Sequence, residues 1–215
     1  MSEDTKLAHS DKKLKKSKAD HEDFDELLQK HVDSEKMVAI FSHRCPDPDA
    51  IGSMMGMRWL LRKHYGIESK LYYDGEVAHP QNVSMDNLLE PGLLKVQDSY
   101  DPLEHDVHIL VDTIPDNAGT AGRKINFDVV IDHHRDLPKD FGGILIHRKV
   151  GSCSGIIYDL IKKLLDENNW FDDEVDIDTK VATALIAGIV TDCMFLMADD
   201  TTEFERHAFN ELFEY

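Results

Sequence analysis

The sequence predicts an α/β domain with a largely parallel sheet flanked by helices. Short apolar runs alternate along the chain with segments of helical periodicity, and this alternation is typical of parallel strands joined by crossover helices. Three of the runs lead into aspartate or histidine. Because ligands of such sheets bind beyond the carboxyl ends of the strands, we expect these polar side chains to meet at one edge of the sheet.

The composition is that of a globular protein with a substantial core. The chain has 215 residues, of which 41% are hydrophobic and 31% are charged. Its 42 acidic and 24 basic residues give a formal net charge of −18, which disfavours nonspecific binding to a nucleic-acid backbone. No apolar run approaches the length of a membrane span and no signal peptide opens the chain. We therefore expect a cytoplasmic protein without a membrane partner.

The N-terminal part differs from the rest of the chain. Residues 1–35 read as a Lys-rich polar tail followed by a short amphipathic helix, in which Phe24, Leu27 and Leu28 share one face. Residues 36–215 carry the remaining strand and helix patterns and are expected to form the functional domain.

In the first half of this domain, residues 37–41 form an apolar run that predicts a buried strand. Apolar residues at helical spacing predict a helix over about residues 50–65, with Gly66 as its C-cap. Residues 69–73 predict the next strand. Residues 79–95 are rich in proline and asparagine and predict loops with short helical pieces.

The second half repeats the pattern. Three further strands are expected at residues 107–111, 127–131 and 143–146. A helix should follow the segment 151–155, and another should cover about residues 178–189. The last helix begins at a capping box formed by Thr202 and Glu205.

The segment after the first strand carries the densest chemistry. His43, Asp47 and Asp49 fall within seven residues, and Pro46 and Pro48 force a stiff loop between them. These side chains could bind a metal ion together from the end of the strand. The alternative is a turn in which Asp49 caps the following helix.

If the polar strand ends converge, they form one cluster of carboxylates and imidazoles. Its members are Asp47, Asp49, Asp112, Asp132, Asp192, His43, His133 and His134. Two carboxylates about 4 Å apart repel by roughly 4 kcal/mol at an effective dielectric near 20, so such a cluster demands cations. Oxygen and imidazole donors suit Mn²⁺ or Mg²⁺. A pair of such ions would convert a bridging water into a hydroxide nucleophile, and phosphoester hydrolysis is the natural reaction.

Four segments of the chain resemble, in the right order, the motifs of the DHH phosphoesterase family. They are His43-x-x-x-Asp47-x-Asp49-Ala50-x-Gly52-Ser53, Val111-Asp112-Thr113, Asp132-His133-His134 and Gly188-Ile189-Val190-Thr191-Asp192. The Asp-Ala-x-Gly-Ser sequence in the first motif is similar to the branch of nanoRNases, pAp-phosphatases and RecJ-like exonucleases.

The resemblance implies two divalent metal ions, usually Mn²⁺, with Mg²⁺ or Co²⁺ as alternatives. Its residues carry over as His43 and Asp47 on one ion, Asp49, His133 and Asp192 on the other, and Asp112 bridging both. Asp132 would orient the ring of His133, as carboxylates often do behind ligating imidazoles. His134 would face the substrate.

Two further residues are candidates for substrate contacts. Arg44 lies within the first motif and could bind a phosphate, or it could simply face solvent. Ser154 precedes a helix whose first amide groups could hold a phosphate, although Ser152 and Ser154 could equally be N-caps.

The resemblance implies a hydrolase for a small phosphorylated nucleotide, either a short single-stranded oligoribonucleotide or a 3′,5′-bisphosphonucleoside. One alternative is an inorganic pyrophosphatase or exopolyphosphatase. Another is a metal- or nucleotide-binding regulatory module, because the glycine-rich motif of the usual C-terminal substrate domain does not occur in this sequence. We therefore expect a DHH catalytic domain alone, completed where needed by a homo-oligomer or another partner.

Overall fold

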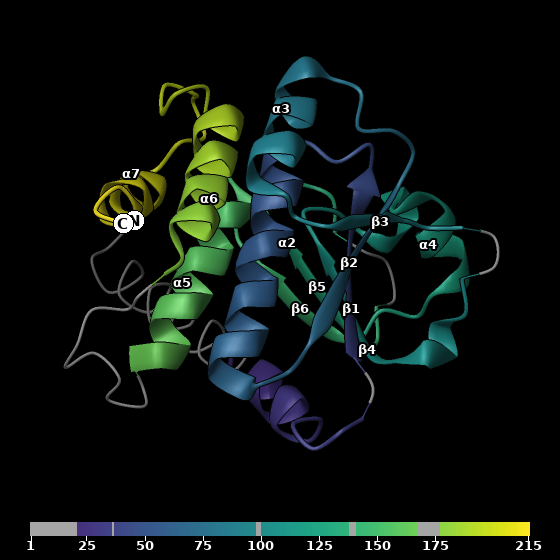
Figure 1. Cartoon of the computed structure of the whole chain (residues 1–215). Coiled ribbons are helices and arrows are strands. Elements are labelled where there is room, and N and C mark those ends of the chain that lie inside the picture. The colour runs from purple at the N-terminus through teal and green to yellow at the C-terminus, as the bar shows by residue number, and fades with distance from the viewer. Residues whose placement is uncertain (1–20, 36, 98–99, 138–140, 167–176) are drawn as a thin grey trace, which may run out of the picture.

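The computed structural model describes residues 21–35, 37–97, 100–137, 141–166 and 177–215 (Figure 1). Its centre is a six-stranded sheet in the order β3-β2-β1-β4-β5-β6, and every neighbouring pair of strands is parallel. The strands are β1 (Met37–Arg44), β2 (Ser69–Asp74), β3 (Leu93–Lys95), β4 (His105–Val111), β5 (Val129–Asp132) and β6 (Ile144–His147). The predicted α/β class with a largely parallel sheet is thus confirmed.

Helices cover both faces of the sheet. They are α2 (Pro48–Leu60), α3 (Pro80–Leu89), α4 (Gly119–Lys124), α5 (Cys153–Asp166), α6 (Thr179–Asp192) and α7 (Glu203–Leu212). Figure 1 shows α2, α5 and α6 side by side on one face, α7 outside α5 and α6, and the short α4 on the other face. Because the chain leaves β1 toward β2 and β3 and later returns to β4, the strand order reverses between β1 and β4. Such a switch point opens a crevice at the carboxyl ends of the strands.

The start of α2 is fixed by its sequence. The Asp47 side chain accepts a hydrogen bond from the amide of Ala50 at 3.0 Å and caps the helix, while Pro48 occupies the first turn. The N-cap is therefore Asp47 and not Asp49, which lies inside the first turn. The regular helix ends at Leu60, and a π-helical turn continues it to Tyr65, close to the predicted end.

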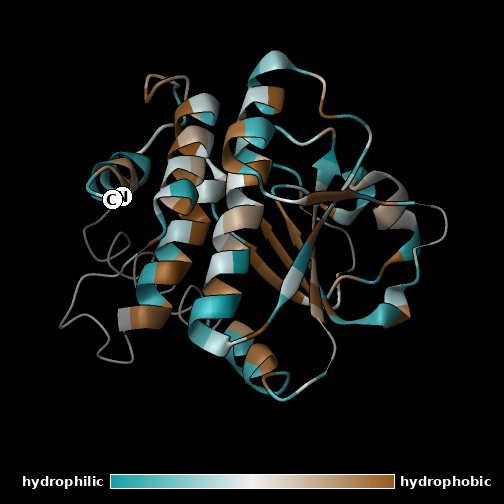
Figure 2. Ribbon diagram, in the orientation of Figure 1, coloured by the Kyte–Doolittle hydropathy of each residue, from teal (hydrophilic) through white to brown (hydrophobic). Residues whose placement is uncertain are grey.

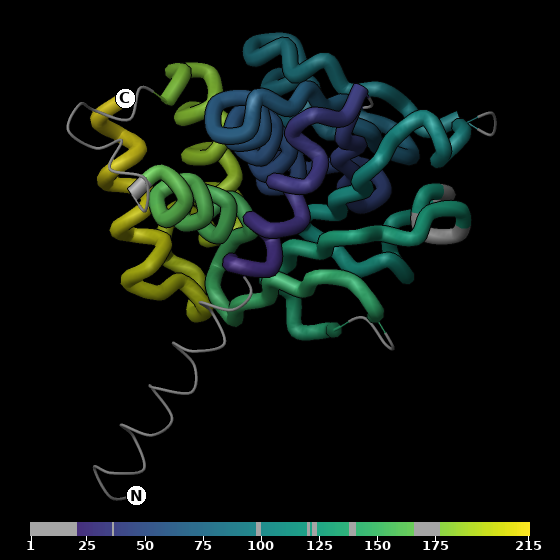
Figure 3. Tube along the Cα trace, turned by 90° about the horizontal axis from the view of Figure 1, so that it is seen from below, coloured from purple at the N-terminus to yellow at the C-terminus, as the bar shows by residue number. Residues whose placement is uncertain are grey.

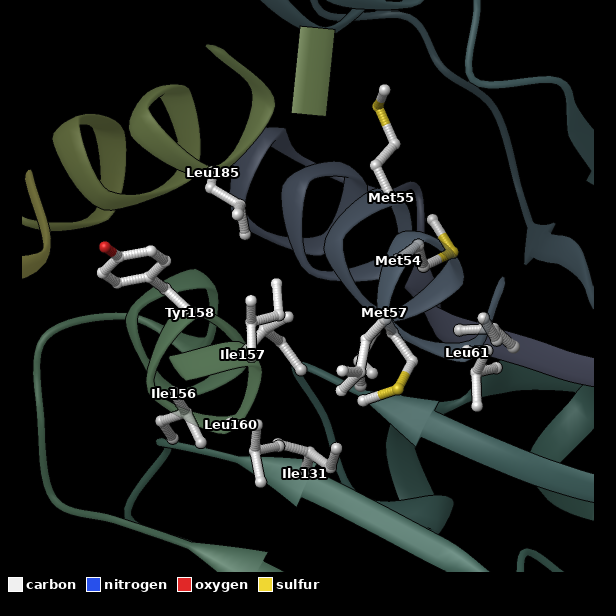
Figure 4. Packing of buried hydrophobic residues seen from close by; sticks show 14 of the residues in the cluster. Met54, Met55, Met57, Leu61, Ile131, Ile156, Ile157, Tyr158, Leu160 and Leu185 are labelled. Carbon is white, nitrogen blue, oxygen red and sulfur yellow. The ribbon is translucent and has the colours of Figure 1, made fainter. Parts of the chain in front are cut away.

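The main hydrophobic core lies between the sheet and the helices α2, α5 and α6. Figure 4 shows Met54 and Met57 of α2 near Ile157 of α5 and Ile131 of β5, with Leu185 of α6 close by. Burying each such side chain contributes about 1.5–3 kcal/mol. Figure 2 shows the same division along the chain, with predominantly hydrophobic strands and helices that are polar on their outer sides. The helix α2 is thus held in place by the core on this face of the sheet.

Residues 21–29 are helical and belong to the same core. Phe24 and Leu28 are fully buried in it, and the hydroxyl of Tyr65 donates a hydrogen bond to Asp25 at 2.8 Å. Figure 3 shows this segment in purple beside α2 and α5. The predicted amphipathic helix therefore packs on the domain, whereas the Lys-rich residues 1–20 lie outside the described part of the chain.

Three features differ from the sequence expectation. Residues 80–89 form one helix, which shows little apolar periodicity because only Asn82 and Met85 are buried in it. The edge strand β3 has three residues, too few for a recognisable run. The six-residue α4 was likewise not expected. None of the helices in the described ranges is long and apolar enough to span a bilayer.

Candidate metal centre

The polar strand ends do meet at one edge of the sheet. The parallel topology places the carboxyl ends of β1, β4 and β5 side by side. The helices α2 and α6 pack against each other, and the start of α2 lies beside the end of α6. The side chains come from the end of β1 (His43), the start of α2 (Asp47 and Asp49), the residue after β4 (Asp112), the end of β5 and the two residues after it (Asp132, His133, His134), and the last residue of α6 (Asp192).

A first group of donors consists of His43, Asp47 and Asp112, with one ligand atom from each lying within 4.8 Å of the others. The Nε2 atom of His43 lies 3.6 Å from Asp47 Oδ1 and 3.4 Å from Asp112 Oδ2. Asp112 is 2% exposed and His43 is partly buried. These three side chains could hold one metal ion.

A second group consists of Asp49, His133 and Asp192, again with one ligand atom each within 4.8 Å. The Nε2 atom of His133 lies 3.2 Å from Asp192 Oδ2 and 3.8 Å from Asp49 Oδ2. The same Nε2 atom lies 3.3 Å from Asp112 Oδ1. Asp112 therefore directs one carboxylate oxygen toward each group, and it is the residue that joins them.

Both imidazoles present the same nitrogen to the cluster. His43 Nδ1 lies 3.0 Å from the carbonyl oxygen of Arg44, and His133 Nδ1 lies 3.1 Å from the carbonyl oxygen of Val150. A carbonyl oxygen can only accept, so Nδ1 carries the proton in each of these hydrogen bonds. In the neutral form of each ring the lone pair is then on Nε2, which is the arrangement that metal-binding histidines need.

Asp49 is held from behind by the start of α5. Its two oxygens accept hydrogen bonds from the amides of Cys153, at 2.7 Å, and Ser154, at 2.8 Å. The hydroxyl of Ser152 accepts one from Gly155 at 3.2 Å, as an N-cap would. The N-terminal amides of this helix thus bind a carboxylate of the protein itself. The expected substrate contact of Ser154 is corrected, since Ser154 is fully buried and its hydroxyl donates to the Asp49 carbonyl at 3.3 Å.

The role expected of Asp132 also needs correction. Its Oδ1 atom accepts from the backbone amides of His133, at 2.9 Å, and His134, at 3.3 Å, and it lies 2.8 Å from the ring Nδ1 of His134. Asp132 therefore orients the ring of His134. The ring of His133 is oriented by the Val150 carbonyl, a backbone atom that no side-chain pattern can reveal.

The crowding of charge is visible in the pKa values. Burial and the neighbouring carboxylates of Asp112 and Asp192 raise the pKa of Asp49 well above its ordinary value. Burial acts against the charged form of His133, yet its contacts with Asp112 and Asp192 raise its pKa to about 12. The pKa of His43 is raised to about 11, against the effect of burial, by Asp112 and Asp47. The two imidazoles are thus the cationic groups that lie against these carboxylates, beside the backbone amides that bind Asp47 and Asp49.

The residues present fit divalent metal ions. Within the described part of the chain, the buried atoms Asp112 Oδ1 and His133 Nε2 lie 3.3 Å apart but form no hydrogen bond of regular geometry with each other or with another residue, although buried polar atoms ordinarily form one. Both atoms point to the place where the two groups meet. Carboxylate oxygens with imidazole nitrogens form the donor set of ions such as Mg²⁺ and Mn²⁺.

The comparison with known proteins agrees with this geometry. A family model described as the DHH family, N-terminal domain, matches residues 37–189. The chain belongs to the DHH family. It is 29% identical over 167 residues to a probable manganese-dependent inorganic pyrophosphatase of Lactiplantibacillus plantarum, covering 76% of this chain and 50% of that protein. It is 27% identical over 187 residues to the uncharacterized protein MJ1633 of Methanocaldococcus jannaschii, covering 85% of this chain and 36% of the relative.

The fold of this DHH-family chain is also found in a solved structure. An exopolyphosphatase-related protein from Bacteroides fragilis superposes with a TM-score of 0.71 at 21% identity, covering 92% of this chain and 56% of that one. The chain thus spans about half the length, or less, of the relatives that it matches.

Two contacts that build the centre are not predicted by the sequence patterns of the residues that make them. The capping box identifies Glu205 as a helix cap, but nothing in the pattern indicates that it also binds the amide of Gly151. Gly188 in the fourth motif faces Asp49 so closely that a Cβ atom there would lie 2.7 Å from Asp49 Oδ1.

Arg44 is exposed at the end of β1, and its contact with substrate stays a prediction.

Proposed function

We propose that this DHH-family chain provides the two-metal centre of a hydrolase that cleaves phosphoric ester or anhydride bonds. The observation that carries the proposal is the position of Asp112, whose two oxygens face two separate groups of donors. A carboxylate placed between two donor groups could serve a pair of neighbouring divalent ions.

In this proposal, His43 and Asp47 would hold one ion, and Asp49, His133 and Asp192 would hold the other. Asp112 would contribute to both sites. Manganese is the first candidate because the pyrophosphatases among the relatives are named as manganese-dependent. When bound, the pair of ions would supply Lewis acidity toward a phosphoryl oxygen and toward water.

The protein's own contribution beyond the ligands centres on His134. Its Nδ1 atom is fixed by Asp132, while its side chain is 55% exposed beside the buried Asp112. The ring can therefore present Nε2 to a phosphoryl or leaving-group oxygen above the metal centre. Arg44, also exposed, is a second candidate for binding the phosphate.

Replacement of His134 by alanine is expected to lower kcat by about 10²- to 10⁴-fold, the usual contribution of a positioned acid–base group. Metal binding should remain, because His133 and Asp112 keep their contacts with the other ligands. The measurements are steady-state kinetics and metal stoichiometry. His207→Ala is the matched control, since that side chain is 71% exposed on α7. Loss of bound metal in His134→Ala would assign this residue to the ligands instead.

Two substrate classes follow from separate observations. The Asp49-Ala50-x-Gly52-Ser53 sequence supports a small nucleotide, a short oligoribonucleotide or a 3′,5′-bisphosphonucleoside. The names of the relatives support inorganic pyrophosphate or polyphosphate. A third possibility is a regulatory module that binds metal or a nucleotide without turnover.

The deciding experiment measures phosphate or nucleotide release by the Mn²⁺-loaded protein from pyrophosphate, tripolyphosphate, a 3′,5′-bisphosphonucleoside and a diribonucleotide. We expect turnover in one class, lost on chelation and regained with Mn²⁺. Preference for pyrophosphate would select the second substrate class over the first. A metal-loaded chain that hydrolyses none of the four would refute the hydrolase proposal for this chain and leave the binding module.

A further inference from the structure

We propose that Glu205 on α7 is a positioning residue of the metal centre, acting through the segment Val150–Ser154. This inference rests on the proposed metal centre but not on any particular substrate. It also extends the functional unit past Asp192 to α7, which lies outside the residues 37–189 that the family model matches.

The segment Val150–Ser154 supports two members of the second donor group directly. The Val150 carbonyl fixes the ring of His133 at 3.1 Å. The amides of Cys153 and Ser154 fix both oxygens of Asp49 at 2.7 and 2.8 Å. A shift of this segment would therefore move two donors at once.

The third member of that group, Asp192, adjoins the same segment through its neighbour. A Cβ atom on Gly151 would lie 2.6 Å from Cys193 Sγ, so the segment packs directly against the residue that follows Asp192. Cys193 itself is fully buried. All three donors of the second group thus depend on where the backbone of Gly151 lies.

Glu205 is the side chain that holds Gly151 in place. It is fully buried, and one of its oxygens accepts a hydrogen bond from the Gly151 amide at 2.6 Å. The other oxygen accepts from the backbone amide and the hydroxyl of Thr202, both at 2.7 Å. A capping box requires only the second oxygen. The first reaches 54 positions back along the chain and serves the segment alone.

The first turn of α7 also contacts the residues on either side of the segment Val150–Ser154. A Cβ atom on Gly155 would lie 3.1 Å from the ring of Phe204, and the guanidinium of Arg148 lies 5.6 Å from the centre of that ring. Phe204 therefore packs on both sides of the segment that its neighbour Glu205 anchors. The start of α7 therefore supports the segment that orients the ligands of the second donor group.

The test is the isosteric substitution Glu205→Gln in the full chain. An amide can accept with only one end, so its NH2 group must face the N–H of either Gly151 or Thr202. We expect Mn²⁺ titration of the metal-free protein by calorimetry to show one site weakened about 10- to 100-fold, the usual cost of losing a group behind the ligands. The other site, built on His43 and Asp47, should keep its affinity. At limiting metal only that site would fill, so the spin–spin coupling of an Mn²⁺ pair should disappear from the electron paramagnetic resonance spectrum.

Glu211→Gln is the matched control on the same helix. Glu211 accepts a hydrogen bond from Lys162 of α5 at 2.6 Å and lies 3.3 Å from His207 Nε2, so its ionic partners are outside the segment Val150–Ser154. We expect this variant to lower the unfolding temperature without changing either Mn²⁺ affinity. As a second probe, Gly151→Ala should reproduce the selective loss of one site, because its Cβ atom displaces the segment while Glu205 stays intact.

The outcomes are separable. If the wild-type chain binds no divalent ion, the proposed metal centre fails. If the wild-type chain binds two ions and both Glu205→Gln and Gly151→Ala keep the two wild-type affinities, only the present inference fails. Equal losses of affinity in Glu205→Gln and Glu211→Gln would also overturn it, since the effect would then reflect the attachment of α7 and not the anchored segment.

Discussion

Substitution of Asp112 by asparagine is expected to abolish binding of both metal ions. Every other proposed ligand belongs to one group, but the oxygens of Asp112 lie 3.4 Å from His43 Nε2 and 3.3 Å from His133 Nε2, one in each group. Removing its negative charge weakens both sites together. Because replacing even a group behind the ligands commonly costs 10–100-fold in metal affinity, we expect a loss above about 100-fold here and no detectable turnover.

Asparagine is the right replacement because of the backbone at this position. Asp112 has a φ of 59°, in the left-handed region where asparagine and aspartate are several-fold enriched. Alanine would add backbone strain to the loss of the ligand. Asp116→Asn, at an exposed acid on the same loop, is the control. Metal analysis that still finds two ions per chain in Asp112→Asn would remove Asp112 from the bridging position.

The second large effect is expected from Gly188→Ala. A Cβ atom at this position would lie 2.7 Å from Asp49 Oδ1 and 2.9 Å from Asp49 Cα, and it would also meet the hydroxyl of Ser154. Asp49 Cα is a backbone atom of α2 and cannot move out of the way as the end of a flexible side chain could. We therefore expect α2 and α6 to move apart, with Asp49 displaced from the second donor group and its Mn²⁺ affinity lowered at least tenfold.

The direction in which Gly188→Ala changes the stability of the metal-free protein tests the packing argument. Alanine in a helix is favoured over glycine by about 1 kcal/mol, whereas overpacking a close contact costs about 1–3 kcal/mol. We expect the steric cost to prevail and the unfolding temperature of the metal-free protein to fall. Gly142→Ala is the control, because a Cβ atom there meets nothing within 4 Å. An unchanged unfolding temperature and unchanged metal affinity in Gly188→Ala would contradict the packing argument.

The sequence carried most of the information about where the donors lie. Asp112 and His133 follow apolar runs, and the parallel topology inferred from those runs brings their ends together without any knowledge of contacts. The strand order itself was out of reach, because the pairing of β1 with β4 involves residues more than 60 positions apart. The short β3 was missed for a different reason, since three residues show no period.

The supporting contacts were largely beyond prediction. Asp132 was expected to orient the ring of His133, but the turn after β5 directs it to His134, and a backbone carbonyl takes the expected place. Glu205 was recognised only in its local role, because a capping box reports contacts three residues apart and not the contact with Gly151. Local patterns identify ligands and caps, whereas the atoms that orient ligands come from distant loops.

The reversal of strand order between β1 and β4 means that each donor group draws on two separate stretches of the chain. His43, Asp47 and Asp49 precede β2, while Asp112, His133 and Asp192 lie at the end of β4 or after it. Ions bound by these groups would link the two stretches within the one sheet. Ligands that bind only the folded state stabilise it, so the stability of the domain would rise and fall with the supply of metal.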